Sequence, residues 1–298
     1  MARLLYGPIG SGSTMSRVAI VTGAGRGLGR AHALAFAAAG YSVVVNDLDD
    51  AASAVVAEIG AQAVANRDDV ADWDGAARLV DTALDTFGRL DVLVNNAGFV
   101  RDRMLVNLGE SEWDDVVRVH MKGHFAPLRH ASAYWRQQHK AGHPVTARVI
   151  NTTSGAGLLG SVGQGNYSAA KAGILGLTFV AAAELDRYGV TVNAIAPAAR
   201  TRMTADTFAA QMAAPVDGFD AMAPENVSPL VVWLGSEDAG DVTGRVFEVD
   251  GGRICLADGW RRGPTVEREE RWPVDEVGPA VRALLDKSVP PEPVYGAG

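Results

Sequence analysis

Three side chains in the second half of the sequence have the types and spacing needed for proton transfer. Tyr167 and Lys171 are four residues apart in a helical stretch, so they share one helix face. A free tyrosine, with a pKa of about 10, is a poor base at neutral pH, but a nearby ammonium group lowers that pKa. Ser154, 13 residues before Tyr167, follows an expected strand and could hydrogen-bond a substrate oxygen. Together they could move a proton between alcohol and carbonyl while a hydride moves to or from nicotinamide. A tyrosine–lysine pair alone is also common on exposed helices.

A glycine-rich turn near the start is of the kind that binds a dinucleotide. It occupies residues 22–29, between the β-branched run Val18–Val21 and the alanine-rich stretch Arg30–Ala39. Glycines let the backbone approach phosphates, and the following helix points free N–H groups and its positive dipole end at a pyrophosphate. This strand–turn–helix context favours a nucleotide site over a purely structural turn. The expected cofactor contacts in the turn are Gly23, Arg26, Gly27, Leu28 and Gly29.

Asp47 bears on the choice between NAD and NADP. It follows the expected second strand, where a carboxylate can accept the hydroxyl protons of the adenosine ribose and repels a 2′-phosphate. Arg26 is the opposing signal, because a guanidinium in the turn could contact that phosphate. We weight the carboxylate more heavily and expect NAD in preference to NADP. Further candidates for cofactor contacts follow the expected third and fourth strands: Asp69, Val70 and Asn96.

Short apolar runs alternate with helical stretches over most of the sequence. The clearest expected strands are Val18–Val21, Ser42–Asn46, Leu90–Val94, Arg148–Thr152, Val190–Ile195 and Val246–Val249, the last one in the chain. The main expected helices are Arg30–Ala39, Asp72–Phe87, Asn166–Arg187 and Ser111–Trp135, the last interrupted by Gly123 and Pro127. Apolar strands separated by helices indicate right-handed crossovers and a parallel sheet buried on both faces. We therefore expect a single α/β domain with a doubly wound parallel sheet of the Rossmann type.

The two ends of the chain depart from this pattern. Residues 1–16 are rich in Gly and Ser and are interpreted as a disordered tail, an alternative start or a cloning remnant. Residues 17–258 form the expected dinucleotide-binding catalytic domain, in which Met203–Asn226 could be a mobile lid. Residues 259–298 are highly charged, then amphipathic over Val274–Lys287, and end in a proline-rich segment. This indicates a C-terminal helical extension and not a second domain.

Composition excludes several classes of partner. Hydrophobic residues make up 48% and charged residues 21%, an ordinary globular balance, and the net charge of −8 argues against nucleic-acid binding. No apolar run approaches the roughly 20 residues of a membrane helix, so we expect no membrane partner. The single cysteine, Cys255, cannot form an internal disulfide. The six histidines show no ligand spacing, so no metal site is expected. A cytoplasmic protein with a small-molecule substrate is the interpretation that remains.

In order and spacing, these motifs resemble those of short-chain dehydrogenases/reductases. The resemblance covers Arg17 to Gly252 and rests on the glycine turn, Asn95-Asn96-Ala97-Gly98, Ser154, Tyr167-x-x-x-Lys171, Asn193-Ala194-Ile195-Ala196-Pro197 and Val249-Asp250-Gly251-Gly252. It implies that Tyr167 is the general acid/base and that Ser154 orients the substrate carbonyl. It also implies that Lys171 lowers the tyrosine pKa and holds the nicotinamide ribose. Further implied cofactor contacts come from Tyr167, Pro197 and Thr201, the last with the nicotinamide carboxamide.

Two positions depart from the family pattern. The family often has an asparagine in a Val-Asn-x-x-Gly context that supports a proton-relay water, and here His120 takes that place between Val119 and Gly123. Histidine can also organise a water, so we include His120 among the catalytic residues. The second departure is Ala198, where Pro-Gly is usual, so the loop that leads into the expected lid could differ locally.

A narrower resemblance concerns the substrate. The segments Val119–Gly123, Gly163–Lys171 and Ala196–Thr204 are similar to the dehydrogenase part of peroxisomal multifunctional β-oxidation enzymes, which oxidise 3-hydroxyacyl-CoA thioesters with NAD. The same region is similar to 3-oxoacyl carrier-protein reductases and hydroxysteroid dehydrogenases. A CoA thioester is therefore the first expected substrate, with a steroid or carrier-bound oxoacyl chain as alternatives. A non-catalytic dinucleotide-binding protein is disfavoured, because Tyr167 and Lys171 are both present.

The family resemblance also bears on assembly. It implies a homodimer or homotetramer built on the long helices around Ser111–Trp135 and Asn166–Arg187. The amphipathic extension could cover the active site of a neighbouring subunit.

Overall fold

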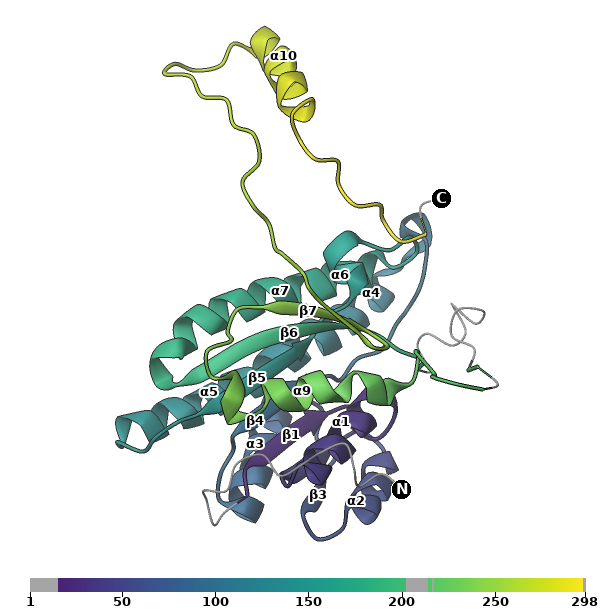
Figure 1. The fold of residues 1–298 in the computed structure, drawn as a ribbon, viewed down its shortest axis with the longest axis vertical. Coiled ribbons are helices and arrows are strands. Elements are labelled where there is room, and N and C mark those ends of the chain that lie inside the picture. The colour runs from purple at the N-terminus through teal and green to yellow at the C-terminus, as the bar shows by residue number, and fades with distance from the viewer. Residues whose placement is uncertain (1–15, 202–213, 216, 297–298) are drawn as a thin grey trace.

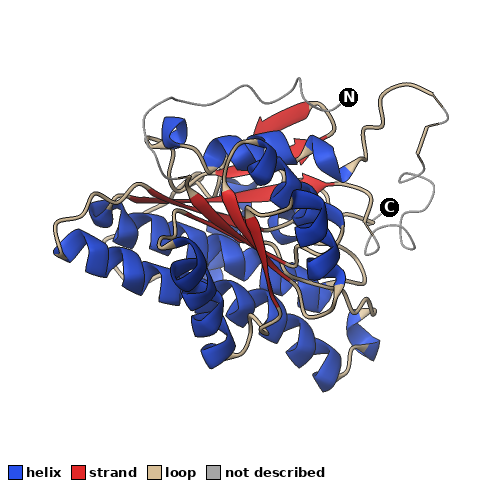
Figure 2. Ribbon diagram, turned by 90° about the horizontal axis from the view of Figure 1, so that it is seen from below, coloured by secondary structure: helices blue, strands red, loops and turns tan. Residues whose placement is uncertain are grey.

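A sheet with helices on both faces forms the body of the protein (Figure 1, Figure 2). The structure is a computed structural model that describes residues 16–201, 214, 215 and 217–296. Its strands are β1 Val18–Thr22, β2 Ser42–Asn46, β3 Ala63–Asn66, β4 Val92–Asn95, β5 Ala147–Thr152, β6 Val190–Ala198, β7 Val246–Asp250 and β8 Arg253–Leu256. Its helices are α1 Gly27–Ala38, α2 Ala51–Ile59, α3 Trp73–Phe87, α4 Glu110–Val117, α5 Gly123–Lys140, α6 Gly155–Leu159, α7 Gly165–Leu185, α9 Ser228–Leu234 and α10 Val274–Leu285.

The strand order creates a crevice between β1 and β4. Across the described residues the order is β3-β2-β1-β4-β5-β6-β7-β8, and β1 to β7 pair in parallel. Because β1 pairs with β2 on one side and β4 on the other, the direction of winding reverses there. Ligands of such sheets bind at this reversal, outside the carboxyl ends of the strands. The order confirms the expected doubly wound parallel sheet.

The edge strand β8 corrects one prediction. The sequence pattern predicts no strand after Val249, but Arg253–Leu256 pairs antiparallel with β7. Three of its four residues are exposed, with Cys255 the least exposed. An exposed edge strand of this length buries too little apolar surface to produce a recognisable pattern.

Two apolar layers hold the helices to the sheet. On one face, strand residues such as Val21, Val45 and Ile195 pack with Phe36 of α1 and Leu234 of α9. On the other face, Ile20, Leu93 and Val192 pack with Leu79 of α3, Trp135 of α5 and Ala181 of α7. Side chains of successive strand residues point to opposite faces, so each central strand supplies both layers. The strands are buried on both sides, as their continuous apolar runs predict.

The long helical region after β4 is interrupted at a different place from the one expected. The break is a π-helical stretch at Arg118–Lys122, between α4 and α5, whereas Pro127 lies inside α5 without ending it. A π-helical turn inserts an extra residue and frequently marks a functional site. Here it carries His120 into the interior.

Helix α7 bears on the expectation about membranes. Together with the following 3₁₀ turn, residues Gly165–Tyr188 are long and apolar enough, by length and composition alone, to cross a membrane. This differs from the expectation from the sequence that no apolar run approaches the length of a membrane helix. In this fold the helix packs against β5 and β6 and carries the buried side chains Lys171, Ile174 and Thr178.

The C-terminal extension leaves the body and returns to it. After β8 the chain runs outward to α10, which stands apart from the sheet, and then comes back to a point near α6 (Figure 1). The helix has no buried residue, and Trp260 on the outgoing segment is 98% exposed. Residues 203–213 and 216 of the segment expected to form a lid, and residues 1–15, lie outside the described residues.

Candidate active site

The glycine turn between β1 and α1 has a shape that side chains would prevent. Gly23 and Gly27 have φ angles of 61° and 53°, in the left-handed region that favours glycine. A Cβ atom on Gly29 would lie 2.2 Å from the carbonyl oxygen of Gly23 and 2.6 Å from Nδ2 of Asn96. The turn can therefore bring its backbone N–H groups close to a bound phosphate, at the N-terminal end of α1.

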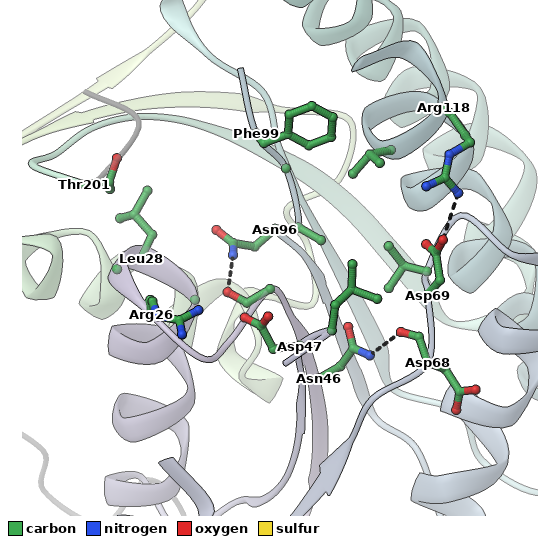
Figure 3. Close-up of a pocket in the computed structure, with 18 residues that line it drawn as sticks. Arg26, Leu28, Asn46, Asp47, Asp68, Asp69, Asn96, Phe99, Arg118 and Thr201 are labelled. Carbon is green, nitrogen blue, oxygen red and sulfur yellow. Dashed lines mark hydrogen bonds and ion pairs between the residues drawn. The ribbon is translucent and has the colours of Figure 1, made fainter. Parts of the chain in front are cut away.

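A cavity of about 390 Å³ opens beside this turn (Figure 3). The residues that line it are Gly23, Arg26, Gly27, Leu28, Gly29, Asn46, Asp47, Leu48, Asp68, Asp69, Val70, Asn96, Ala97, Gly98, Phe99, Arg118, Val119 and Thr201. Most of the expected cofactor contacts are in this set. Among the described residues, the expected contacts Tyr167, Lys171 and Pro197 lie outside it.

Asp47 and Arg26, the two residues that bear on cofactor choice, are held differently. Oδ2 of Asp47 accepts a hydrogen bond from the backbone N–H of Gly25 at 2.9 Å, which fixes the carboxylate at the end of β2. Nη1 of Arg26 lies 2.6 Å from Oδ2 of Asp49. The guanidinium that could have met a 2′-phosphate is therefore engaged with a carboxylate.

Asn96 supports the turn from the neighbouring strand. Its Nδ2 donates to the carbonyl oxygen of Thr22 at 2.9 Å and to that of Gly23 at 3.3 Å. The hydroxyl of Thr22 in turn accepts from the backbone N–H groups of Asn96 and Ala97, at 2.9 and 3.0 Å. These bonds tie the ends of β1 and β4 together and shape the cavity floor.

The start of α7 places Tyr167 by means of a buried amide. Oδ1 of Asn166 accepts from the backbone N–H of Tyr167 at 2.8 Å, while its Nδ2 donates to the carbonyl oxygens of Arg101 and Glu112, both at 3.1 Å. Asn166 is fully buried. The helix that carries the tyrosine is thus joined to the loop after β4 and to α4.

Ser154 is held at the N-terminus of α6, just after β5. Its Oγ accepts from the backbone N–H of Ala156 at 3.2 Å, as an N-cap. A Cβ on Gly157 would lie 2.7 Å from Cβ of Lys171, so α6 and α7 approach closely because this residue is glycine. The approach brings Ser154 toward Tyr167, and a hydrogen bond between the two side chains favours a lower tyrosine pKa.

Burial dominates the pKa of Tyr167, contrary to the expectation from the family. Despite the hydrogen bond to Ser154, loss of solvation raises the pKa of the tyrosine to about 12, and the charge of Asp102 adds to the rise. Lys171 is 2% exposed, and burial lowers the pKa of its ammonium group to about 7. Its Nζ donates to the carbonyl oxygen of Thr152 at 2.6 Å and lies 5.5 Å from the centre of the Tyr167 ring.

His120 lies against the tyrosine from the other side. Its Nε2 lies 2.7 Å from the carbonyl oxygen of Phe99. A Cβ on Gly98 would lie only 2.2 Å from Cε1 of the imidazole, so the ring can approach the backbone there because residue 98 is glycine. Burial, with the nearby charge of Lys171, lowers the pKa of His120 to about 3. The imidazole is therefore neutral at physiological pH.

The sequence matches a known protein family. A family model described as short chain dehydrogenase matches residues 17–212. The chain belongs to the short-chain dehydrogenase family. It is an oxidoreductase, and its family uses a nicotinamide cofactor, NAD or NADP.

Several relatives of this short-chain dehydrogenase have names that indicate their activity. A hydroxyacyl-CoA dehydrogenase, ChsB1, from Mycobacterium tuberculosis is 49% identical over 80% of this chain and 79% of its own. A 3-oxoacyl-[acyl-carrier-protein] reductase from Synechocystis is 44% identical over 81% of this chain and 98% of its own. The mouse peroxisomal multifunctional enzyme type 2 is 45% identical over 80% of this chain, which spans only 32% of that enzyme.

A solved structure is similar over nearly the whole length. The crystal structure of a short chain dehydrogenase from Mycobacterium avium is 61% identical, with a TM-score of 0.88, over 96% of this chain and all of the other.

The glycine turn of this short-chain dehydrogenase fits a dinucleotide, because the left-handed φ of Gly23 and Gly27 and the close packing at Gly29 let the backbone turn tightly beside the cavity, at the N-terminal end of α1. Sequence reasoning missed other residues of the cavity. Arg118 lies 2.8 Å from Oδ2 of Asp69, and Asn46 donates to the carbonyl oxygen of Asp68 at 2.9 Å (Figure 3). Their pairing depends on how the π-helical stretch, β2 and the loop after β3 meet. Asn46 and Asp68 lie at or just after strand ends, which is a usable signal.

The segment after β6 lies over the turn. Cγ2 of Thr201 would be 3.5 Å from a Cβ on Gly27, and Arg200 forms an ion pair with Asp220. Within residues 16–201, 214–215 and 217–296, no group of three or more His, Cys, Asp and Glu side chains could hold a metal ion.

Proposed function

We propose that this protein is an NAD-dependent dehydrogenase of 3-hydroxyacyl thioesters, with CoA as the carrier. The observation that carries the proposal is the meeting of Ser154, Tyr167 and Lys171 at the carboxyl end of β5, next to the cavity that holds Asp47. The named activity of the M. tuberculosis relative supports the thioester substrate.

We propose that Tyr167 accepts the proton of the substrate hydroxyl and Ser154 binds the same oxygen. Ser154 supports this role because its hydrogen bond already favours the phenolate form of Tyr167. When bound, the nicotinamide supplies the hydride acceptor. Burial raises the pKa of Tyr167 to about 12 with Lys171 already 5.5 Å from its ring, so release of the proton needs more positive charge than Lys171 alone provides. In its protonated form Lys171, whose Nζ is anchored on Thr152, contributes part of that charge.

For Lys171 the proposed role has a second part. Because Nζ donates to the carbonyl oxygen of Thr152, the last residue of β5, the ammonium group is held at the end of that strand. A primary ammonium has three donors, so the others can serve the ribose hydroxyls of the nicotinamide nucleoside. Pro197 lies in β6, and Thr201, in the chain after it, lines the dinucleotide cavity.

NAD is the proposed cofactor in preference to NADP. The carboxylate of Asp47 points into the cavity at the end of β2, where the 2′-phosphate of NADP would meet a fixed negative charge (Figure 3). The ion pair between Arg26 and Asp49 reduces the attraction the arginine could offer that phosphate.

A second candidate is reduction of 3-oxoacyl chains on a carrier protein. The Synechocystis relative with that name is matched over 98% of its length, which favours this alternative over a steroid substrate. Both reactions use the same catalytic side chains, so only the carrier and the cofactor distinguish them.

The test is a spectrophotometric assay of NADH and NADPH with matched substrates. Oxidation of 3-hydroxyacyl-CoA with NAD is the expected activity, and 3-oxoacyl chains on a carrier protein and a ketosteroid are the comparison substrates. Preference for the carrier-bound chain with NADPH would replace the proposal by the second candidate. Turnover of none of them with either cofactor would remove both.

We also propose a cytoplasmic homo-oligomer whose subunits bind one another through the extension. Helix α10 places Val274, Val277, Val281 and Leu285 at helical spacing, and all four are partly or largely exposed. A helix of 12 residues is marginal in water unless an apolar face is packed. The extension carries charges of both signs, which suits a protein surface better than nucleic acid or an anionic membrane. A second copy of this chain, in a symmetric contact, is the proposed occupant.

A further inference from the structure

The end of the chain is bound to the substrate side of its own active site. The backbone N–H of Val162 donates to the carbonyl oxygen of Tyr295 at 2.9 Å, and the N–H of Tyr295 donates to that of Gly160 at 3.2 Å. Ser161 and Tyr295 form a parallel bridge. Tyr295, which lies 39 residues after β8 ends at Leu256, thus pairs with the loop between α6 and α7 in the manner of an added strand.

The ring of Tyr295 lies over Gly155, the residue that follows the proposed catalytic serine. A Cβ on Gly155, the residue after Ser154, would lie 2.9 Å from both Cε2 and Oη of Tyr295. The phenol therefore covers the backbone at the start of α6, and it can do so because residue 155 is glycine. Val294 packs in the same way, 3.4 Å from where a Cβ on Gly160 would be.

Tyr295 also forms a wall of a second cavity. This cavity of about 300 Å³ lies between the loop after β4, which includes Met104, and the loop before α7, which includes Val162 and Gln164. Gln164 is three residues before Tyr167, so the cavity begins next to the proposed reaction centre. None of the described residues that line it lines the dinucleotide cavity.

The charged side chains at this cavity already have partners within the protein. Both carboxylate oxygens of Asp102 accept from Nε2 of Gln164, at 3.1 and 3.2 Å. Nε of Arg103 lies 3.3 Å from Oε1 of Glu112. The remaining surfaces come from the apolar side chains of Met104 and Val162 and from the ring of Tyr295. A surface of this kind suits an aliphatic chain better than a charged headgroup.

We propose that Tyr295 is a specificity-determining residue whose ring contacts the acyl chain of the substrate beyond its reacting carbon. The inference rests on the proposed function and deepens it. With the reacting oxygen between Ser154 and Tyr167, an extended substrate passes the ring over Gly155 before it enters the second cavity. Short substrates end before the ring, and long ones pack against it. The C-terminal extension thus has a role in substrate choice as well as the proposed role in assembly.

The test compares substrate length with and without the ring. Wild type, Tyr295→Ala and Tyr295→Phe are assayed in the full chain with short, medium and long 3-hydroxyacyl-CoA thioesters, and in reverse with plain methyl ketones of increasing length. In Tyr295→Ala, kcat/KM is expected to fall about tenfold for long substrates and to change little for the shortest, the size of effect that one or two methylene contacts produce. Tyr295→Phe is expected to behave like wild type, because the ring makes the contact.

A matched control removes a tyrosine elsewhere. Tyr188→Ala changes the 3₁₀ turn at the far end of α7 and is expected to leave the length preference unaltered. An unchanged or increased ratio of long to short kcat/KM in Tyr295→Ala, for thioesters and ketones alike, overturns the role of the ring. Turnover of ketones but not thioesters by wild type overturns the proposed function, while the ketone series still tests Tyr295. An equal loss for all lengths shows a structural effect and overturns the inference.

Discussion

The imidazole of His120 packs edge-on against the ring of Tyr167, with ring centres 5.2 Å apart and planes at 87°. The histidine is itself fixed by the carbonyl oxygen of Phe99 and by the backbone of Gly98. Because burial lowers its pKa to about 3, the imidazole stays neutral near neutral pH. These contacts assign it the task of holding the tyrosine ring and make direct proton transfer by the imidazole a poor explanation.

A His120→Ala variant tests this positioning role. The alanine leaves space beside the Tyr167 ring, so kcat is expected to fall about tenfold through loss of alignment. The pH dependence of kcat/KM is expected to keep its shape, because the histidine is neutral over the measured range. Disappearance of an acidic limb from that profile would show instead that His120 takes part in proton transfer.

Removal of the Tyr167 hydroxyl tests the proposed chemistry. In Tyr167→Phe the ring still packs on His120, but the proton acceptor is gone, so kcat is expected to fall by a factor of about 10²–10⁴. The dissociation constant for NAD, measured by titration of protein fluorescence, is expected to stay within about twofold. Tyr188→Phe is the control, and activity equal to that of wild type in Tyr167→Phe would rule out the mechanism.

Much of the fold and the site could be predicted from the sequence because the signals are local. The glycine turn, Asp47 and Ser154 each follow a buried strand, and Tyr167 and Lys171 share a helix face, so neighbouring residues determine where they lie. The parallel sheet likewise follows from apolar runs separated by helices.

The features that sequence reasoning missed depend on contacts between distant segments. Arg118 meets Asp69 across 49 residues, and the tail brings Tyr295 to Gly155 over a still longer separation. The pKa of Tyr167 is the clearest case, since a nearby lysine predicts a lowered pKa whereas packing by the whole fold raises it. Desolvation is a property of the three-dimensional surroundings and has no pattern in the chain.

Neutralising Asp47 is expected to relax cofactor choice. In Asp47→Asn the side chain can still accept from the N–H of Gly25, but the negative charge that opposes a 2′-phosphate is removed. The ratio of kcat/KM for NADP to that for NAD is expected to rise about tenfold, as measured with one substrate at constant ionic strength. Asp50→Asn, which removes an exposed charge paired with Arg67, is the matched control. Equal ratios in wild type and Asp47→Asn would contradict the proposed preference for NAD.

Stability is expected to fall as the pH decreases below about 6.5. His32 is fully buried in α1, and burial lowers its pKa from 6.5 to about 3. Between these values the unfolded chain binds a proton that the folded chain does not, so folding weakens by up to about 1.4 kcal/mol per pH unit for each such histidine. Urea unfolding at several pH values should give a shallower pH slope for His32→Asn than for wild type. His143→Gln is the control, and an unchanged slope in His32→Asn would show that this histidine is not responsible.

The apolar face of α10 is expected to be needed for assembly. Among the described residues this face is exposed, with Val274 at 92% and Leu285 at 64%, and a second subunit is the proposed partner that buries it. Val277→Asp combined with Val281→Asp places two charges on it without shortening the chain, and is expected to reduce the molar mass measured by light scattering at low protein concentration. Asp286→Asn at the end of the helix is the control. A mass unchanged at every concentration would mean that α10 does not bind a second subunit.

Because Tyr295 follows α10 in the chain, the same double variant is also expected to weaken discrimination of long substrates if assembly holds the tail in place.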